Sequence, residues 1–205
     1  MPLISEVYPL FMLPSYFVII GTLTGAAGSV AYVTETVRGK VKPNRVTFLL
    51  WSIVPFIAFF AQIKQGVGLE ALMTFSTGLM PLAVFIASFV NKQAEWKVTT
   101  FDLICGVLSL LGLMLWMITK VGNIAIFFSI VADGLAAVPT ILKAYRYPGT
   151  EIAWPWIATV FGVIITLLTI SDFTFANSGF ILYILVVNTL IFNLVQFRLG
   201  EKTAT

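Results

Sequence analysis

The sequence contains no histidine and a single cysteine, Cys105, and only 10% of its 205 residues are charged. Without histidine the chain lacks the commonest general base of enzymes, and a lone cysteine excludes disulfides within the chain and the usual zinc sites. The acids are not clustered and no serine-based dyad is recognisable. We therefore expect no enzyme, no cofactor, no bound metal and no nucleic-acid partner.

Long apolar runs fill the sequence instead. Hydrophobic residues make up 59% of the chain, and the mean hydropathy is +1.00. Because one crossing of a lipid bilayer takes about 20 apolar residues, and lipid leaves no backbone group unpaired, we predict an all-α polytopic membrane protein with seven transmembrane helices. The start of the chain carries no basic segment, so we expect no cleaved signal peptide. The predicted spans cover residues 14–37, 45–62, 69–90, 98–119, 123–144, 152–170 and 175–199.

Lysine and arginine are distributed unevenly between the spans. Only Lys64 and Lys120 follow span two or span four, and the other basic residues lie on the opposite side. Since basic loops stay in the cytoplasm, we expect a cell (plasma or inner) membrane protein with its N-terminus outside and its C-terminus in the cytoplasm. The basic residues on the cytoplasmic side are Arg38, Lys40, Lys42, Arg45, Lys92, Lys97, Lys143, Arg146, Arg198 and Lys202.

The chain also repeats itself weakly at an offset of 105 residues. Spans one to three match spans five to seven, and the single fourth span keeps the two units in the same orientation. We predict a 3+1+3 arrangement with triple-helix repeats in residues 1–90 and 121–205 and a linker helix in residues 91–120. Parallel repeats of this kind place transporter sites at the repeat interface near the membrane midplane. The identical pairs are Ala27 and Ala132, Ala31 and Ala136, Val33 and Val138, Pro43 and Pro148, Trp51 and Trp156, and Phe56 and Phe161.

The second half contains a motif made of Val138-Pro139-Thr140, Lys143, Gly149-Thr150-Glu151 and Trp154-Pro155-Trp156. This motif resembles the pattern of the SWEET and PQ-loop (MtN3-saliva-like) transporter superfamily. That pattern has Pro-Gln or Pro-Thr, a basic residue, a short loop with Ser/Thr-Glu and a proline that opens the next helix. The first half departs from it, with Thr34-Glu35 in place of Pro-Gln and Leu50 opposite Pro155, so the chain resembles a divergent, bacterial-type member.

The resemblance implies a carrier for a small solute, and it leaves a homo-oligomer open because related transporters often associate. The family's sugar site uses an asparagine near the middle of spans three and seven. Span three has Ser76, Thr77 and Gly78 in its place, and Asn188 and Asn193 of span seven lie deeper than the family position. We therefore expect transport of a small polar solute without carrying over sugar specificity.

Asp133 is the strongest candidate for a functional residue, because it lies near the centre of span five. A carboxylate at the bilayer centre costs about 2.5 kcal/mol or more. We expect Asp133 to be protonated, to face an aqueous cavity or to bind a cation, which suits proton-coupled transport. A neutral carboxyl bonded to a neighbouring helix is the structural alternative.

Three polar residues, Ser76, Thr77 and Asn188, are predicted to line a pocket with Asp133 across the repeat axis. Asparagine can both donate and accept hydrogen bonds, which suits a hydroxyl- or amide-bearing solute. It also links helices to one another, and this role is favoured for Asn193.

Trp51 and Trp156 occupy equivalent places in the repeats and are predicted to anchor the chain at the membrane interface. A stacking wall for a ligand is the alternative. Prolines inside helices permit bends that serve as hinges, although they are also common in transmembrane helices in general. The hinge candidates are Pro55, Pro81, Pro139 and Pro155, with Pro139 preferred.

Near the cytoplasmic ends, Glu35 and Asp102 are expected to pair with nearby lysine or arginine, and a gate built on Glu35 is the alternative. The sequence thus favours a carrier that works by alternating access, either as a facilitator or coupled to protons through Asp133. The other hypotheses are a seven-helix receptor that binds no retinal, since span seven has no lysine, and a membrane scaffold without transport activity.

Overall fold

The computed structural model describes residues 12–94, 96–119 and 122–200, and within these ranges the chain is helical with no strand. Lys120, Lys202 and the start of the chain, on which parts of the sequence predictions rest, lie outside the described residues. The helices are α1 (Phe17–Val37), α2 (Arg45–Trp51), α3 (Val54–Lys64), α4 (Ala71–Ala87), α5 (Thr100–Thr119), α6 (Gly122–Arg146), α7 (Trp154–Leu167) and α8 (Phe175–Gln196), with 3-10 turns η2 (Lys92–Ala94) and η3 (Pro148–Thr150).

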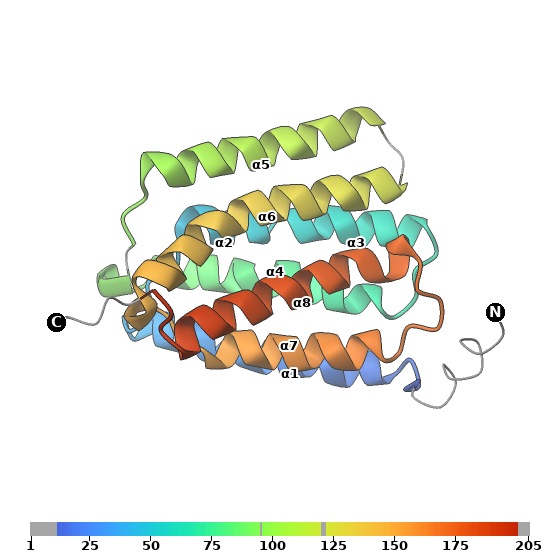
Figure 1. Ribbon diagram of the computed structural model, residues 1–205, viewed down its shortest axis with the longest axis horizontal. Helices are drawn as coiled ribbons and strands as arrows, with labels where there is room; N and C mark the ends of the chain where they lie inside the picture. Colours follow the sequence, from blue (N-terminus) through green and yellow to red (C-terminus); the bar gives the residue numbers. More distant parts are fainter. Residues whose placement is uncertain (1–11, 95, 120–121, 201–205) are drawn as a thin grey trace.

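These helices form seven rods in the described chain, because α2 and α3 together make one interrupted rod (Figure 1). Each rod falls within a few residues of a predicted span. Four rods, at Phe17–Val37, Arg45–Lys64, Gly122–Arg146 and Phe175–Gln196, are long and apolar enough to cross a membrane. The others contain shorter apolar helices, at Ala71–Ala87, Thr100–Leu111 and Trp154–Leu167.

Polar caps and glycines set the ends of several helices. The Asn44 side chain accepts hydrogen bonds from the backbone N–H groups of Val46 (3.1 Å) and Thr47 (3.2 Å), which starts α2. Gly39 and Gly66 follow α1 and α3 with φ of +78° and +80°, a region where a side chain would be strained. These glycines turn the chain back into the bundle.

The break between α2 and α3 lies at Ser52 and Ile53, just before Pro55. A proline cannot bond the carbonyl four residues earlier, which here belongs to Trp51, and its ring clashes with it. Pro81 and Pro139 lie inside the continuous helices α4 and α6, and Pro155 opens α7. Of the four hinge candidates, Pro55 is therefore the one that interrupts a rod, whereas sequence reasoning preferred Pro139.

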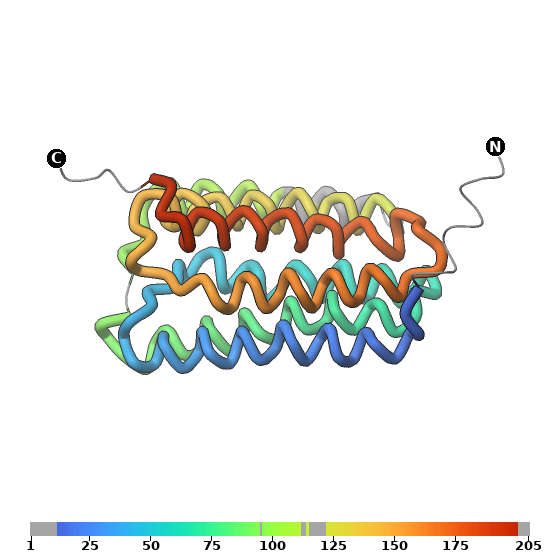
Figure 2. Tube along the Cα trace, turned by 60° about the horizontal axis from the view of Figure 1, so that its bottom comes forward, coloured from blue at the N-terminus to red at the C-terminus, as the bar shows by residue number. Residues whose placement is uncertain are grey.

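The rods run along one common long axis. α1 begins at one end of the bundle and α8 ends at the opposite end (Figures 1 and 2). α4 contacts α1 on one side and the α2–α3 rod on the other, and α8 likewise contacts both α6 and α7. The two groups meet where α1 packs on α7 and where α3 packs on α6. α5 packs along α6 and touches α2 at the edge of the bundle.

The contact between α1 and α7 is unusually close. A Cβ added at Gly28 would lie 2.7 Å from the Cβ of Ala158 and 3.0 Å from the Pro155 carbonyl oxygen. A Cβ at Gly21 would lie 2.5 Å from the Gly162 carbonyl oxygen. Small residues thus let the two helix backbones touch, as they do in membrane helix pairs.

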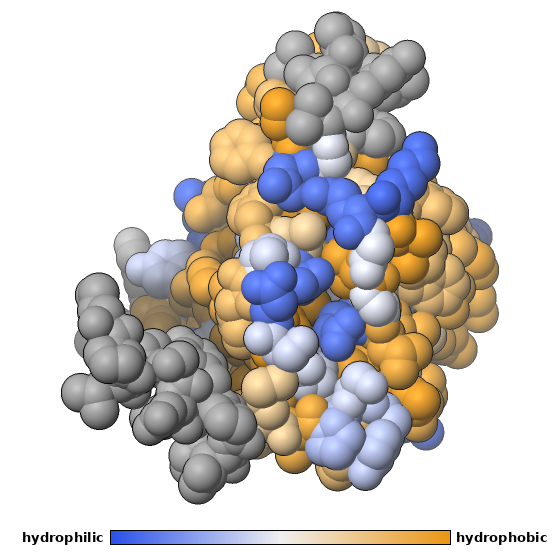
Figure 3. All heavy atoms as spheres, turned by 90° about the vertical axis from the view of Figure 1, so that its right-hand side faces the viewer, coloured by the Kyte–Doolittle hydropathy of each residue, from blue (hydrophilic) through white to orange (hydrophobic). Residues whose placement is uncertain are grey.

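The outer surface is more apolar than that of a soluble protein, and polar side chains are buried among the hydrophobic core residues. Every α-helix exposes large apolar side chains, whereas the buried residues include Thr47, Gln62, Asp133, Lys143 and Glu151. In Figure 3, which views the end where α1 begins, hydrophilic residues gather in the middle of the end face and hydrophobic residues surround them. Soluble monomers rarely expose apolar surface on this scale, so the chain is compatible with a lipid environment.

Candidate functional site

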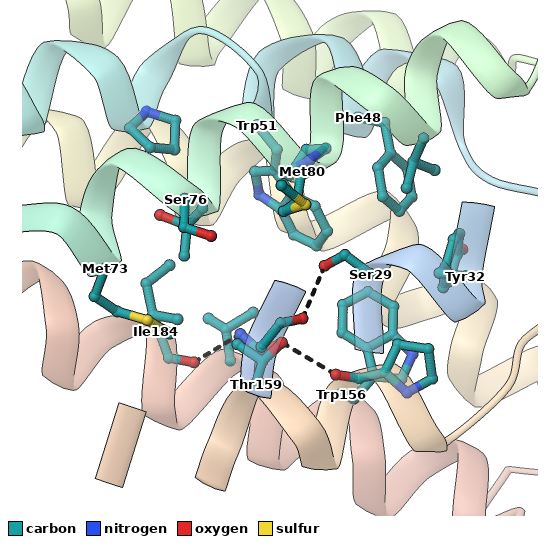
Figure 4. A pocket seen from close by; sticks show the side chains of 18 of the residues that line it. Ser29, Tyr32, Phe48, Trp51, Met73, Ser76, Met80, Trp156, Thr159 and Ile184 are labelled. Atoms are coloured by element: carbon teal, nitrogen blue, oxygen red, sulfur yellow. Dashed lines mark hydrogen bonds between the residues drawn. The ribbon is translucent and has the colours of Figure 1, made fainter. Parts of the chain in front are cut away.

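A cavity of about 90 Å³ lies inside the bundle, with room for several water molecules or a small solute. Its walls come from α1, the α2–α3 rod, α4, α6, α7 and α8 (Figure 4). The lining residues are Gly25, Ser29, Tyr32, Phe48, Trp51, Pro55, Met73, Ser76, Thr77, Met80, Pro81, Val84, Asp133, Pro155, Trp156, Thr159, Ile184, Val187 and Asn188.

All six residues predicted to form a binding site line this one cavity. They come from five rods and both halves of the sequence, and their roles in binding stay predictions. Three of the four hinge candidates, Pro55, Pro81 and Pro155, also line it, whereas Pro139 is buried in α6 away from the lining. The six site residues are Trp51, Ser76, Thr77, Asp133, Trp156 and Asn188.

Asp133 is 2% exposed and has only part of its hydrogen-bonding capacity filled. The Tyr183 hydroxyl of α8 donates to its Oδ2 at 2.7 Å, and the indole N–H of Trp51 donates to its backbone oxygen at 3.3 Å. Its Oδ1 is buried without a hydrogen-bond partner. A buried carboxyl oxygen with no partner is costly, so a further hydrogen-bond donor would stabilise Asp133.

Four other polar side chains of the cavity donate to their own helices. The hydroxyls of Ser29, Thr77 and Thr159 bond the carbonyl oxygens of Gly25 (3.2 Å), Thr74 (2.8 Å) and Pro155 (3.0 Å). The Asn188 amide donates to the Ile184 carbonyl oxygen at 2.8 Å (Figure 4). Each of these groups has used a donor but keeps lone pairs on its oxygen. These four side chains therefore keep acceptor oxygens, beside the second N–H of the Asn188 amide and the hydroxyl of Ser76.

Four aromatic rings pack edge to face along one side of the cavity. Trp51 and Trp156 have centroids 6.0 Å apart, Phe48 lies 5.4 Å from Trp51, and Tyr32 lies 5.8 Å from Trp156. Both tryptophans are more than nine-tenths buried. The favoured prediction of an interfacial anchor is therefore wrong for this pair, and they form a wall of the cavity instead.

Comparison with protein-family models, with curated proteins and with solved structures finds no match to this chain. The site is therefore interpreted from its own geometry. In the described part of the chain, no three His, Cys, Asp or Glu side chains come together in a group that could hold a metal ion.

A buried charge cluster, which the sequence reasoning missed, joins the cavity to one end of the bundle. The Lys143 ammonium of α6 lies 2.5 Å from Oε1 of Glu151, and the Tyr32 hydroxyl donates to Oε2 of Glu151 at 2.8 Å. Lys143 also donates to the Lys42 carbonyl oxygen and lies 5.1 Å from the centre of the Trp96 ring. Because Tyr32 lines the cavity, the cluster lies directly behind the aromatic wall.

A signal for this cluster was present in the sequence. Glu151 follows Lys143 by eight residues across a proline-containing turn, a spacing that lets a helix end fold back onto its own loop. From the sequence, Lys143 is predicted as a cytoplasmic charge and, like Glu151, as part of the motif, without a pairing between the two. Their burial depends on α1, which no local pattern reveals.

The remaining polar predictions have mixed outcomes. Glu35 pairs with the exposed cations Arg38 (2.6 Å) and Lys40 (3.0 Å), as expected. Asp102 instead caps its own helix, since its Oδ2 accepts from the Thr99 backbone N–H at 2.6 Å. The Asn193 amide bonds the Thr189 carbonyl oxygen of its own helix at 2.7 Å, so that hydrogen bond links no second helix.

Proposed function

We propose that this chain is a membrane transporter that moves a small polar solute by alternating access around the central cavity. The observation that carries the proposal is the cavity itself, which is lined by Asp133 and Asn188 from one half of the sequence and by Ser76 and Thr77 from the other. A site shared between two halves is the place where their relative motion would expose a solute to one side and then to the other.

The helix contacts support two triple-helix units joined by a linker helix. In each half the third rod, α4 or α8, packs on both other rods. This common packing order agrees with the repeat at 105 residues and with α5 as a spacer that restores the orientation of the second unit. In a membrane the two units would face the same way, which is the arrangement of a 3+1+3 transporter.

The buried charge cluster supports a closed state at one end of the cavity. Tyr32 belongs to the first unit, whereas Lys143 and Glu151 belong to the second. Their contacts hold the units together between the cavity and the end that carries most of the lysines and arginines. By the positive-inside rule that end is cytoplasmic, so the conformation corresponds to one closed toward the cytoplasm of a cell membrane.

Solute uptake into proteoliposomes tests the proposal. Purified protein is first screened with sugars, amino acids, vitamins and organic cations for thermal stabilisation, and stabilising solutes are then offered as labelled substrates. Saturable uptake above that of empty liposomes is expected. Binding without uptake of any stabilising solute would contradict transport and favour a receptor.

A pH gradient separates a facilitator from a proton-coupled carrier. If protons are coupled through Asp133, an inward gradient accelerates uptake and Asp133→Asn abolishes that acceleration. The exposed acid Asp172 provides a matched control, since Asp172→Asn changes the same chemistry away from the cavity. If the Asp133→Asn variant takes up the solute and its uptake responds to the pH gradient as in the wild type, coupling through this residue is ruled out.

A further inference from the structure

Several polar groups that line the cavity have unfilled hydrogen-bonding capacity. Oδ1 of Asp133 has no partner, and the oxygens of Ser29, Thr77, Thr159 and Asn188 retain lone pairs after their donors have bonded their own helices. The indole N–H of Trp156 is a buried donor without a partner. A ligand that completes this set carries several N–H or O–H donors and one acceptor.

The charge of Asp133 and the aromatic wall of the cavity narrow the chemical class of the ligand further. Among the described residues that line the cavity, Asp133 is the only acid and no lysine or arginine faces it. A carboxylate at this depth is costly unless a cation accompanies it. The rings of Trp51, Trp156 and Phe48 offer π-faces and edges close by, and aromatic faces attract organic cations.

We propose, building on the proposed transport function, that the solute of this cavity is a small protonated amine. Its ammonium group would bind the carboxylate of Asp133 and the acceptor oxygens, and its carbon atoms would pack on the aromatic wall. An oxygen on the same solute would accept the N–H of Trp156. A neutral polyol supplies donors but leaves the carboxylate without a counter-charge.

Ethanolamine and ethylene glycol form the matched probe pair, because they have the same size and differ in an ammonium against a hydroxyl. Thermal unfolding of the detergent-purified protein at neutral pH is measured with each. At saturating concentration ethanolamine is expected to raise Tm by about 2–4 °C or more, and ethylene glycol is expected to have no effect. Equal stabilisation by both, or by ethylene glycol alone, overturns the proposal.

Variants locate the effect in the cavity. Asp133→Asn is expected to weaken ethanolamine binding about tenfold or more, since a charge-assisted hydrogen bond is lost, whereas the exposed control Asp172→Asn binds like the wild type. If Asp133→Asn does not fold, Thr159→Val removes one acceptor at nearly constant volume and is expected to weaken binding by a smaller factor. Unchanged affinity in the folded cavity variants overturns the assignment.

Uptake of labelled ethanolamine separates a failure of the amine proposal from a failure of the transport proposal. Stabilisation by ethanolamine without uptake would leave the ligand class standing and refute transport. Saturable uptake of a neutral solute that ethanolamine does not inhibit would leave transport standing and refute the amine.

Discussion

Two buried polar regions lie next to one another in this bundle, and they differ in how completely they are satisfied. In the buried charge cluster, the ammonium of Lys143 meets a carboxylate and a carbonyl oxygen, and both oxygens of Glu151 accept a hydrogen bond. In the cavity, Oδ1 of Asp133 and the N–H of Trp156 have no partner. Tyr32 belongs to both regions, as it lines the cavity and bonds Glu151.

The difference indicates what each region does. A satisfied buried network fixes one arrangement of the helices around it, whereas an incomplete one keeps a free-energy cost that a ligand can remove. Substitutions in the cluster should therefore change stability, and substitutions in the cavity should change binding more than stability. The following predictions test that division, from the largest expected effect on stability to the smallest.

Glu151→Gln should be the most damaging change. It leaves the ammonium of Lys143 buried without its counter-charge, and breaking a buried ion pair in this way costs about 3–5 kcal/mol. Thermal or denaturant unfolding in detergent measures the loss. Combining it with Lys143→Met removes the orphaned charge, so the double variant should lose less than the sum of the two single variants. Strict additivity would show that the pair is not coupled.

Gly28→Ala should have the next largest effect, because its methyl group would meet Ala158 and the Pro155 carbonyl of α7 at 3.0 Å or less. Forcing the helices apart should cost about 1–3 kcal/mol. Gly25→Ala is the control on the same helix, since its Cβ would meet Met73 and Thr159 at 3.7 Å, an ordinary contact. Similar melting temperatures for the two variants would contradict the close packing of α1 on α7.

Tyr183→Phe tests the cavity side of the comparison. It removes the hydrogen bond to Oδ2 of Asp133, with an expected loss of about 1 kcal/mol. Because this change leaves the carboxyl group with two unpaired oxygens, we expect solute binding to change more than the unfolding midpoint. Ligand titration and thermal unfolding of the same preparation measure both effects. A large loss of stability with unchanged binding would place Tyr183 in the structural network instead.

Glu35→Gln should have the smallest effect. Glu35 also contacts two cations, Arg38 and Lys40, but those cations are exposed at the end of α1. Exposed ion pairs contribute little because water and salt screen them, so the unfolding midpoint should not change measurably in 0.15 M salt. A loss comparable to that of Glu151→Gln would show that burial does not set the difference between the two pairs.

Much of the fold could be predicted from the sequence, because the periods of apolar residues and the interrupting polar loops are local signals. The predicted spans lie within a few residues of the helices. The cavity residues Asp133, Asn188, Ser76 and Thr77 were also identified, since polar groups inside an apolar span must find partners or water. Depth along a span can be estimated by counting residues from its ends.

The direction in which a side chain points could not be obtained in the same way. Trp51 and Trp156 looked like interfacial residues from their depth, and their inward orientation depends on the packing of four helices. Pro55 interrupts its rod while Pro139 does not, although both are preceded by apolar helical sequence. Lys143 is buried because α1 and the loop after α6 close over it, which is a tertiary effect.

The glycine contact between α1 and α7 has a mechanical consequence. It joins a helix from one half of the sequence to a helix from the other, and no side chain separates their backbones there. Such a seam can rotate or slide slightly but has little slack for separation. Any opening of the cavity would then be a rotation about the contact between α1 and α7. In this rotation α6, which carries Asp133, and α4, which carries Ser76, would move apart.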